Sequence, residues 1–415
     1  MRQSFKITDC EACVVFDSRG SETVEVELWS SQTSARVSAP SGKSRGKNEA
    51  VPFPPKGAGQ AVEVFEKQLK PRLIGFDPAD QRGLDTLMKQ VDGTENFSNI
   101  GGNLSYAVSA AAALLTARLT DKPLWRYISE LSGIKPSMPL PLGNILGGGA
   151  HAGGGAPDVQ EFLVYPSYPR SVEEALKINI EAHRKLGRIL MQKVGGYGGG
   201  RSDEGGYSPP VDDYSALKYV AEAVEGFDVG LGLDVAASTL YDPGSGVYVY
   251  RNRGVKRTRL EQLEFIKQLV EAFHLSYVED PFEETDFSSF AELCRTFPDL
   301  LVCGDDLVVT RKELVKKAAD NGSVRAVILK PNQVGCLSDT LEAAAEAERR
   351  GIVRVVSHRS GETCDAFLAH LAVGLGGKFI KAGVVGGERV AKANELLRIW
   401  RRHRGELAIA EAGSR

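Results

Sequence analysis

The chain has 415 residues, of which 42% are hydrophobic and 25% are charged, and its formal net charge is −3. This length is too great for one ordinary core, so two domains are expected in a globular protein of this composition. No run of Lys or Arg is long enough to follow a phosphate backbone, and the longest apolar stretch, residues 107–117, is too short to cross a bilayer. We therefore expect neither nucleic acid nor a membrane as a partner.

The first third of the chain has the pattern of a small α+β domain. Apolar and polar residues alternate at 23–29, as in a half-buried strand, and residues 35–39 are the expected hairpin partner. The last of three helical patterns is rich in alanine and apolar nearly all round, which indicates burial between layers. We expect this domain to comprise residues 1–134. The helical patterns lie at residues 59–69, 78–90 and 103–119.

The second domain, residues 135–415, repeats one pattern six times: a short apolar run that stops at an ionisable residue. Buried parallel strands read as continuous apolar runs, and a strand with its helix and loops takes about 25 residues. The pattern predicts an α/β fold, a (β/α)8 barrel whose first strands lie near residues 140–146 and 162–165. Strand ends of this kind carry the active site in such barrels. The run ends are Asp234, Glu279, Asp305, Lys330, His358 and Lys381, at successive intervals of 45, 26, 25, 28 and 23 residues.

Periodic apolar patterns between the runs predict the helices of the barrel. Thr310 and Glu313 have the spacing of a capping box at a helix start. The basic residues 401–404 are expected to be a solvated helix end, where cations suit the helix dipole. The predicted helices lie at residues 260–273, 287–297, 310–320, 338–350, 362–375 and 388–401.

The acids and lysines at the run ends suggest metal-assisted proton transfer. Asp234, Glu279 and Asp305, if packed together, repel one another unless a cation lies between them, and charged oxygen ligands suit Mg²⁺. The alternative is that each acid caps a neighbouring helix. Lys330 and Lys381 each fit a general base, a Schiff-base nucleophile or an ion-pair partner. A base must be neutral near pH 7, and burial or a neighbouring cation favours that by lowering the lysine pKa.

Other polar residues suit an anionic substrate and an acid catalyst. The consecutive residues His358, Arg359 and Ser360 offer hydrogen-bond donors for a phosphate. Glu161 and Glu204, if held close, would share a proton, and one of the two pKa values would rise as a general acid requires. His151, between glycines, fits either a functional or a loop histidine.

Cysteine usage indicates a reducing compartment. The chain has six cysteines, and the pair Cys10 and Cys13 has no second pair at zinc spacing, so strand residues are the simpler interpretation. Free thiols and an N-terminus without an apolar segment lead us to expect a cytoplasmic protein.

Strings of residues along nearly the whole chain resemble, in order and spacing, the motifs of the enolase family. The match is that of a divergent, archaeal-like member. It implies an N-terminal α+β domain that caps a barrel of ββαα(βα)6 type, and the reversible dehydration of 2-phosphoglycerate to phosphoenolpyruvate. The similar strings lie at residues 17–20, 23–26, 40–42, 92–96, 148–154, 160–162, 203–206, 233–234, 278–282, 304–307, 329–333, 357–363 and 380–383.

The resemblance also implies roles for individual residues. Lys330 matches the base that takes the proton from C2, and Glu204 matches the acid that protonates the leaving C3 hydroxyl, with Glu161 as its partner. His151 and His358 match histidines near the reacting groups. The matching substrate-binding positions are Ser44, His151, Gln160, Glu161, Arg359, Ser360 and Lys381.

Metal ligands and assembly follow from the resemblance alone. Asp234, Glu279 and Asp305 match the ligands of a first Mg²⁺, and Ser44, on a mobile lid, matches a ligand of a second Mg²⁺ that binds with substrate. A homodimer or higher homo-oligomer is expected. The lid departs from the family pattern, since Lys43 and Arg45 stand where Ala and Thr are usual.

Three alternatives compete with this interpretation. A relative in the wider superfamily would act on another carboxylate but would lack the string His358-Arg359-Ser360. A Schiff-base aldolase would not need three metal carboxylates. A non-catalytic paralogue acting as a binding protein would be expected to have lost a reacting group.

Overall fold

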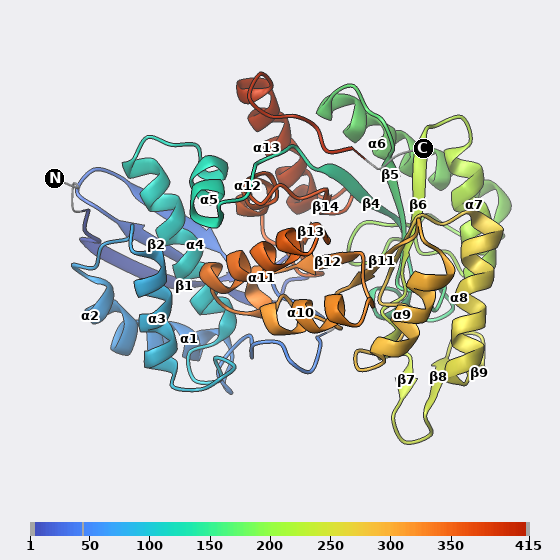
Figure 1. Cartoon of the computed structure of the whole chain (residues 1–415), viewed down its shortest axis with the longest axis horizontal. Helices are drawn as coiled ribbons and strands as arrows, with labels where there is room; N and C mark the ends of the chain where they lie inside the picture. Colours follow the sequence, from blue (N-terminus) through green and yellow to red (C-terminus); the bar gives the residue numbers. More distant parts are fainter. Residues whose placement is uncertain (1–4, 44, 412–415) are drawn as a thin grey trace.

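The computed structural model describes residues 5–43 and 45–411. An N-terminal sheet with its helices lies beside a larger barrel, and the segment around α11 lies between the two (Figure 1). The two parts follow one another along the chain, because local antiparallel pairing builds the first part and repeated strand–helix units build the second.

The N-terminal part contains a three-stranded antiparallel sheet in the order β1-β2-β3. The predicted alternating strand is β2, which pairs with the predicted partner β3 through contacts such as Val26 opposite Val37. The alanine-rich helix α4 is buried along nearly its whole length, as predicted, and α5 is a helix that was not predicted. The elements are β1 (Asp9–Phe16), β2 (Glu22–Trp29), β3 (Ser34–Ser38), α1 (Ala58–Val64), the π-helical turn η1 (Phe65–Leu69), α2 (Lys70–Leu73), α3 (Gln81–Asp92), α4 (Gly102–Leu119) and α5 (Leu124–Ser132).

Eight strands close the barrel in the order β10-β11-β12-β13-β14-β4-β5-β6. Only β5 runs antiparallel to its two neighbours, β4 and β6, whereas the other adjacent pairs are parallel. With two helices after β5 and one after each later strand, the barrel has the ββαα(βα)6 topology that the family resemblance implied. The strands are β4 (Leu140–Gly147), β5 (Glu161–Pro166), β6 (Val229–Asp234), β10 (Tyr277–Glu279), β11 (Leu301–Gly304), β12 (Ala326–Leu329), β13 (Val353–Ser357) and β14 (Phe379–Lys381).

Helices surround the barrel, and one small sheet interrupts the repeat between β6 and α8. This sheet of β7 (Tyr241–Asp242), β8 (Val247–Tyr250) and β9 (Val255–Arg257) extends away from the barrel in Figure 1. It explains why the interval of 45 residues between Asp234 and Glu279 is longer than the others. The helices are α6 (Val172–Lys193), α7 (Asp213–Val224), α8 (Arg259–Phe273), α9 (Phe287–Thr296), α10 (Lys312–Asp320), α11 (Leu337–Arg349), α12 (Phe367–Gly374) and α13 (Gly387–His403), with short 3₁₀ turns η2 (Gly149–His151), η3 (Ala237–Thr239) and η4 (Pro331–Gln333).

Two local predictions were wrong because tertiary contacts use the same side chains. The capping box at Thr310 does not form: α10 starts at Lys312, and the Thr310 hydroxyl donates to Gln333 Oε1 at 2.6 Å. The helix predicted from residue 362 starts at Phe367 instead. Glu362 lies in the preceding loop, where its carboxylate is 2.6 Å from Lys392 Nζ.

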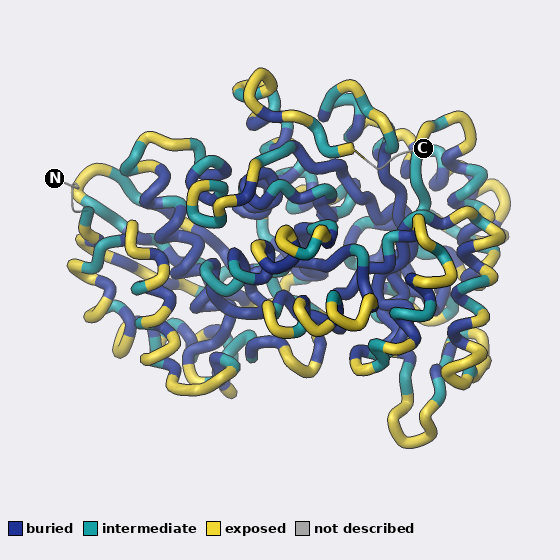
Figure 2. The backbone as a smooth tube through the Cα atoms, viewed as in Figure 1, coloured by how far each residue is buried: buried dark blue, intermediate teal, exposed yellow. Residues whose placement is uncertain are grey.

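The barrel interior is a packed core and not a channel. Side chains from strands around the ring, including Tyr165 and Phe379 with ring centroids 4.8 Å apart, form a separate buried cluster inside it. Figure 2 shows the tube buried through the strands and exposed on the outer helices. Among the described helices, none combines the length and apolarity needed to cross a membrane. The core supports a rigid rim on which the strand-end residues lie.

Asp92, the last residue of α3, holds the loop that follows it. Its buried carboxylate accepts hydrogen bonds from the backbone N–H groups of Thr94, Asn99 and Ile100 at 2.8–3.0 Å. Asp92→Ala leaves these donors unpaired and should lower the free energy of unfolding by about 3 kcal/mol, measured by urea denaturation. Glu95→Ala, at an exposed position of the same loop, should change it by less than about 0.5 kcal/mol. Equal effects of the two substitutions would contradict this account.

Candidate active site

The predicted site residues line one small cavity at the carboxyl ends of the barrel strands. Its volume of about 20 Å³ has room for about one water molecule. The lid is the segment around residues 40–44 named by the resemblance, and its described part covers the mouth of this cavity. Ser41 in the lid pairs with Gly361 through backbone hydrogen bonds. The lining residues are Gly42, His151, Gln160, Glu161, Glu204, Asp234, Asp305, Lys330, Ser357, His358, Arg359, Ser360 and Lys381.

Lys381 joins three carboxylates at the centre of the site. Its buried ammonium lies 2.8 Å from Asp234 Oδ2, 2.9 Å from Glu279 Oε1 and 3.2 Å from Glu161 Oε2. These acids end β6 and β10 and begin β5, strands that are neighbours in the barrel, so register alone places them together. Glu279 does not line the cavity but reaches it through this contact.

Lys330 forms the second ion pair of the site, with Asp305. The Lys330 ammonium contacts Asp305 Oδ2, while Gln333 Nε2 donates to Asp305 Oδ1 at 2.9 Å. Burial lowers the pKa of Lys330, but the surrounding carboxylates, Asp305 first among them and Glu279 after it, together raise it above its usual range. The neutral lysine that a base requires is therefore not favoured while Asp305 holds the ammonium.

The strand-end acids carry more negative charge than the two lysines balance. Burial and the neighbouring Asp234 carboxylate raise the pKa of Glu279 to about 8. Burial acts the same way on Asp305, but Lys330 holds the pKa of that carboxyl below its usual range. A divalent cation would relieve this repulsion, and buried oxygen donors suit a hard ion such as Mg²⁺.

Side-chain spacing within the described part of the chain also allows cation binding at two groups of residues. One group is His151, Glu161 and Glu204, and the other is Asp280, Asp305 and Asp306. The predicted ligand set of Asp234, Glu279 and Asp305 is not one of these groups, and its carboxylates contact the ammonium groups of Lys381 and Lys330. That set stays a prediction.

Glu161 and Glu204 lie together, as predicted, with two histidines beside them. His151 Nδ1 is 3.6 Å from Glu204 Oε1 and 3.8 Å from Glu161 Oε1, and His358 Nε2 is 3.2 Å from Glu204 Oε2. Burial and the Glu204 carboxylate raise the pKa of Glu161 well above its usual range. Burial also acts on Glu204, but His358 and His151 keep the pKa of Glu204 low. One pKa of the pair is thus raised, and it belongs to Glu161 and not to Glu204, which the resemblance named as the acid.

The predicted phosphate-binding residues contact the lid. Arg359 Nη1 lies 2.9 Å from Glu49 Oε2, and both side chains are buried. The Ser360 hydroxyl accepts from the backbone N–H of Lys43 at 2.9 Å. The Lys43 ammonium reaches Asp203, beside Glu204, at 3.3 Å. Ser44 lies outside the described residues.

Sequence reasoning missed two residues that hold the site. Glu49, the partner of Arg359, is a lone acid after the lid and carries no local signal. Gln333, which donates to Asp305, belongs to a string that resembled the family, but nothing in the string assigned it a role. Gln160, a predicted substrate contact, donates to Asp234 Oδ2 at 3.4 Å.

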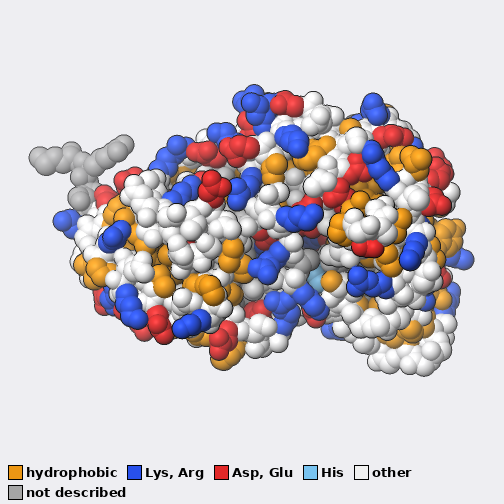
Figure 3. Space-filling view, turned by 90° about the horizontal axis from the view of Figure 1, so that it is seen from below, with side chains coloured by type: hydrophobic (Ala, Val, Ile, Leu, Met, Phe, Trp, Pro, Cys, Tyr) orange, Lys and Arg blue, Asp and Glu red, His pale blue; other side chains and the backbone are white. Residues whose placement is uncertain are grey.

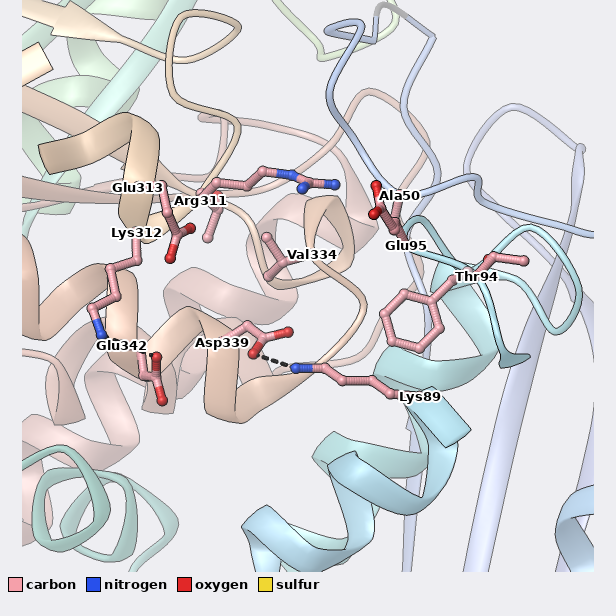
Figure 4. A pocket seen from close by; sticks show the side chains of 12 residues that line it. Ala50, Lys89, Thr94, Glu95, Arg311, Lys312, Glu313, Val334, Asp339 and Glu342 are labelled. Carbon is pink, nitrogen blue, oxygen red and sulfur yellow. Dashed lines mark hydrogen bonds and ion pairs between the residues drawn. The ribbon is translucent and has the colours of Figure 1, made fainter. Parts of the chain in front are cut away.

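The molecule has a further hollow of about 390 Å³ between the N-terminal part and the barrel. In Figure 4 its walls carry Lys89 paired with Asp339 at 2.6 Å, and Lys312 paired with Glu342 at 3.3 Å. These opposite charges pair with one another in the wall of the hollow, and none of the predicted site residues that the structure describes lines it. On the face drawn in Figure 3, Lys and Arg side chains gather around a hollow near the middle of the molecule, and a histidine shows within it.

The fold and the site together define a barrel enzyme with buried acids, lysines and histidines at the strand ends and a carboxylate cluster suited to a cation. Two family models match the chain, "Enolase, N-terminal domain" over residues 7–128 and "Enolase, C-terminal TIM barrel domain" over residues 135–411.

Curated relatives match almost the full length. The chain is 42% identical to the enolase of Methanothermobacter thermautotrophicus over 400 residues, which cover 95% of this chain and 96% of that protein. It is 42% identical to the enolase of Pyrobaculum aerophilum over 406 residues and 41% identical to that of Archaeoglobus fulgidus over 399, with the same coverage of both chains. The chain belongs to the enolase family.

The buried His358 ring should make the protein sensitive to acid. Burial lowers the pKa of His358 to about 4, whereas a histidine in an unfolded chain has a pKa near 6.5. The unfolded state therefore binds a proton first, so this group costs up to about 3 kcal/mol of stability as the pH falls from about 6.5 to about 4. His358→Gln should reduce the pH dependence of the unfolding free energy in this window, measured by urea denaturation. The same slope in both proteins would refute the assignment.

Proposed function

We propose that this chain catalyses the reversible dehydration of 2-phosphoglycerate to phosphoenolpyruvate, as a hydro-lyase of glycolysis and gluconeogenesis. Membership of the enolase family over nearly the full length supports the reaction. The single structural observation that supports it best is the cavity itself, which is lined by Lys330, Lys381, Glu204, Glu161, Asp234 and Asp305, with Glu279 in contact with Lys381. A non-catalytic paralogue would have no need to retain all of these groups.

The reaction needs two proton transfers, and they take place on opposite sides of the cavity. Lys330, at the end of β12, takes the proton from C2 once Asp305 no longer holds its ammonium. Glu204 donates a proton to the C3 hydroxyl as it leaves, and Glu161 is the reservoir for that proton because its pKa is raised beside Glu204. His151 and His358 flank Glu204 and hold the pair in place.

The remaining polar residues bind the anionic ends of the substrate. Arg359 and Ser360 bind the phosphate, which takes the place of Glu49 on the Arg359 guanidinium. Lys381 contacts the substrate carboxylate and stabilises the charge that develops on it, while Gln160 and His151 line the wall. A cavity of about 20 Å³ cannot hold the substrate, so the lid carrying Ser44 must open for binding.

Magnesium is the proposed cofactor, with two ions in each active site. Asp234, Glu279 and Asp305 would hold the first ion, and Ser44 would contribute to the second when substrate binds. When bound, the ions supply positive charge that stabilises the ene-diolate formed after proton loss. The raised pKa of Glu279 supports a cation at these acids.

The oligomeric state, the cellular location and the domain bounds are also proposals. We propose a cytoplasmic homodimer or higher homo-oligomer without nucleic-acid or membrane partners. In this proposal the capping domain comprises residues 1–134 and the barrel domain comprises residues 135–415.

Lys330→Ala should lower turnover of 2-phosphoglycerate by about 10³-fold or more, because a positioned general base contributes about 10²–10⁴-fold. Phosphoenolpyruvate formation in the presence of Mg²⁺ measures it, and a chelator should abolish turnover in the native protein. Lys316→Ala, at an exposed site on α10, is the control for loss of a positive charge. Undiminished turnover in Lys330→Ala would refute the base, and no turnover in the native protein would refute the reaction.

Lys43→Ala tests the contact between the lid and the acid loop. The Lys43–Asp203 ion pair is partly exposed, with 48% and 27% of the side chains accessible, so it contributes on the order of 0.5 kcal/mol. We expect KM for 2-phosphoglycerate to rise about twofold, and the difference to shrink at high salt. Lys56→Ala removes the same charge outside the lid and should leave KM unchanged. A salt-independent change would exclude an ion-pair latch.

A further inference from the structure

Arg389 is a buried cation that the proposed mechanism does not use. It lies in the first turn of α13, and 1% of its surface is accessible. Its Nη1 atom lies 2.6 Å from His358 Nδ1 and donates to the Arg359 carbonyl at 2.7 Å. Its Nη2 atom donates to the Ser360 carbonyl at 2.6 Å and to the Asp203 carbonyl at 3.4 Å. The guanidinium therefore joins the loop after β13 to the loop that carries Glu204.

The contact with His358 determines which ring nitrogen carries the proton. Arginine has only donors and stays protonated, so a nitrogen 2.6 Å from it must accept. His358 Nδ1 is then the acceptor, and the ring proton lies on Nε2. Nε2 is the ring nitrogen that lies 3.2 Å from Glu204 Oε2, close to the carboxylate but outside hydrogen-bond geometry in this structure.

This arrangement is unusual for a purely structural arginine. A buried guanidinium is normally balanced by a carboxylate, yet the positive end of the α13 dipole makes this position unfavourable for a cation. The carboxylate nearest the guanidinium belongs to Glu388, which lies 3.2 Å from Nε and is 20% accessible. The Nη atoms face three carbonyls and the imidazole instead. This geometry favours a role in orienting His358.

We propose that Arg389 is a positioning residue that holds His358 as the neutral tautomer protonated on Nε2, so that His358 always presents an N–H donor to Glu204. A donor at this point favours the ionised form of Glu204 Oε2 and leaves the shared proton of the acid pair on the Glu161 side. Without Arg389, the ring is free to carry its proton on Nδ1, and Nε2 then presents a lone pair to the carboxylate. The effect on turnover rests on the proposed function, but the tautomer does not.

The test determines directly which nitrogen of the His358 ring carries the proton, in the ligand-free protein. The protein has six histidines, so labelling with ¹⁵N-histidine gives few signals, and His358→Gln identifies the signal of His358 by its loss. At pH 7, two-bond ¹H–¹⁵N correlation should show His358 neutral with its proton on Nε2. A native ring protonated on Nδ1, or on both nitrogens, would overturn the proposal whatever the variants do.

Variants then test whether Arg389 is the cause. Arg389→Met should convert His358 to a mixture of tautomers and lower kcat by about tenfold or more, with a smaller change in KM. Arg389→Lys keeps a donor and should restore the Nε2 tautomer in part. Lys392→Met, which removes another buried cation one turn further along α13, should leave the tautomer unchanged. An unchanged tautomer in folded Arg389→Met would overturn the proposal.

The two readouts separate the two proposals. If the native chain fails to convert 2-phosphoglycerate while His358 keeps its Nε2 proton, the proposed reaction fails and the inference about Arg389 stands. If turnover is normal but the ring proton lies on Nδ1, the reverse holds. If Arg389→Met does not fold, the native spectrum and Arg389→Lys still decide the matter.

Discussion

The site depends on a surplus of buried negative charge that two lysines only partly balance. Lys381 bridges Asp234, Glu279 and Glu161, and Lys330 holds Asp305, all at the ends or starts of barrel strands. Such a cluster is costly in a low-dielectric interior unless each charge has a close partner. Burial, together with the neighbouring Asp234 carboxylate, raises the pKa of Glu279 to about 8, and the repulsion among these acids is the reason a cation would bind here. The same excess of acids explains why the two lysines are held as ammonium groups in ion pairs and not as neutral amines.

At both the lid and the acid pair, charged side chains contact internal partners that substrate groups could replace. Glu49 occupies Arg359 with an anionic side chain, and a substrate phosphate offers the same charge with more acceptor oxygens. His358 and His151 pair with Glu204, and Glu161 carries the raised pKa. The cavity has a volume of only about 20 Å³, so few water molecules can compete with these contacts. In the proposed mechanism, binding and proton transfer would exchange these internal partners for substrate groups.

Much of the fold could be predicted from local pattern. Each of the apolar runs that stop at an ionisable residue became a barrel strand, because strands buried on both faces need continuous apolar residues. The repeat does not predict α6 and α7, since the antiparallel β5 precedes them and breaks the alternation of strand and helix. The local rules for helix starts failed at Thr310 and Glu362, because tertiary contacts compete with capping there. The Thr310 side chain contacts Gln333, and the Glu362 side chain contacts Lys392.

The amino-acid sequence alone determined the order of the strands and which side chains would stand at their carboxyl ends, because strand periodicity and barrel closure leave little choice. Its resemblance to a family supplied the chemical roles. Only the tertiary structure decided the partners of those side chains: Glu49 meets Arg359 across 310 residues, and Arg389 on α13 meets His358 in the loop after β13. Such pairs depend on how loops pack over the barrel mouth, and no local pattern of residues encodes that packing.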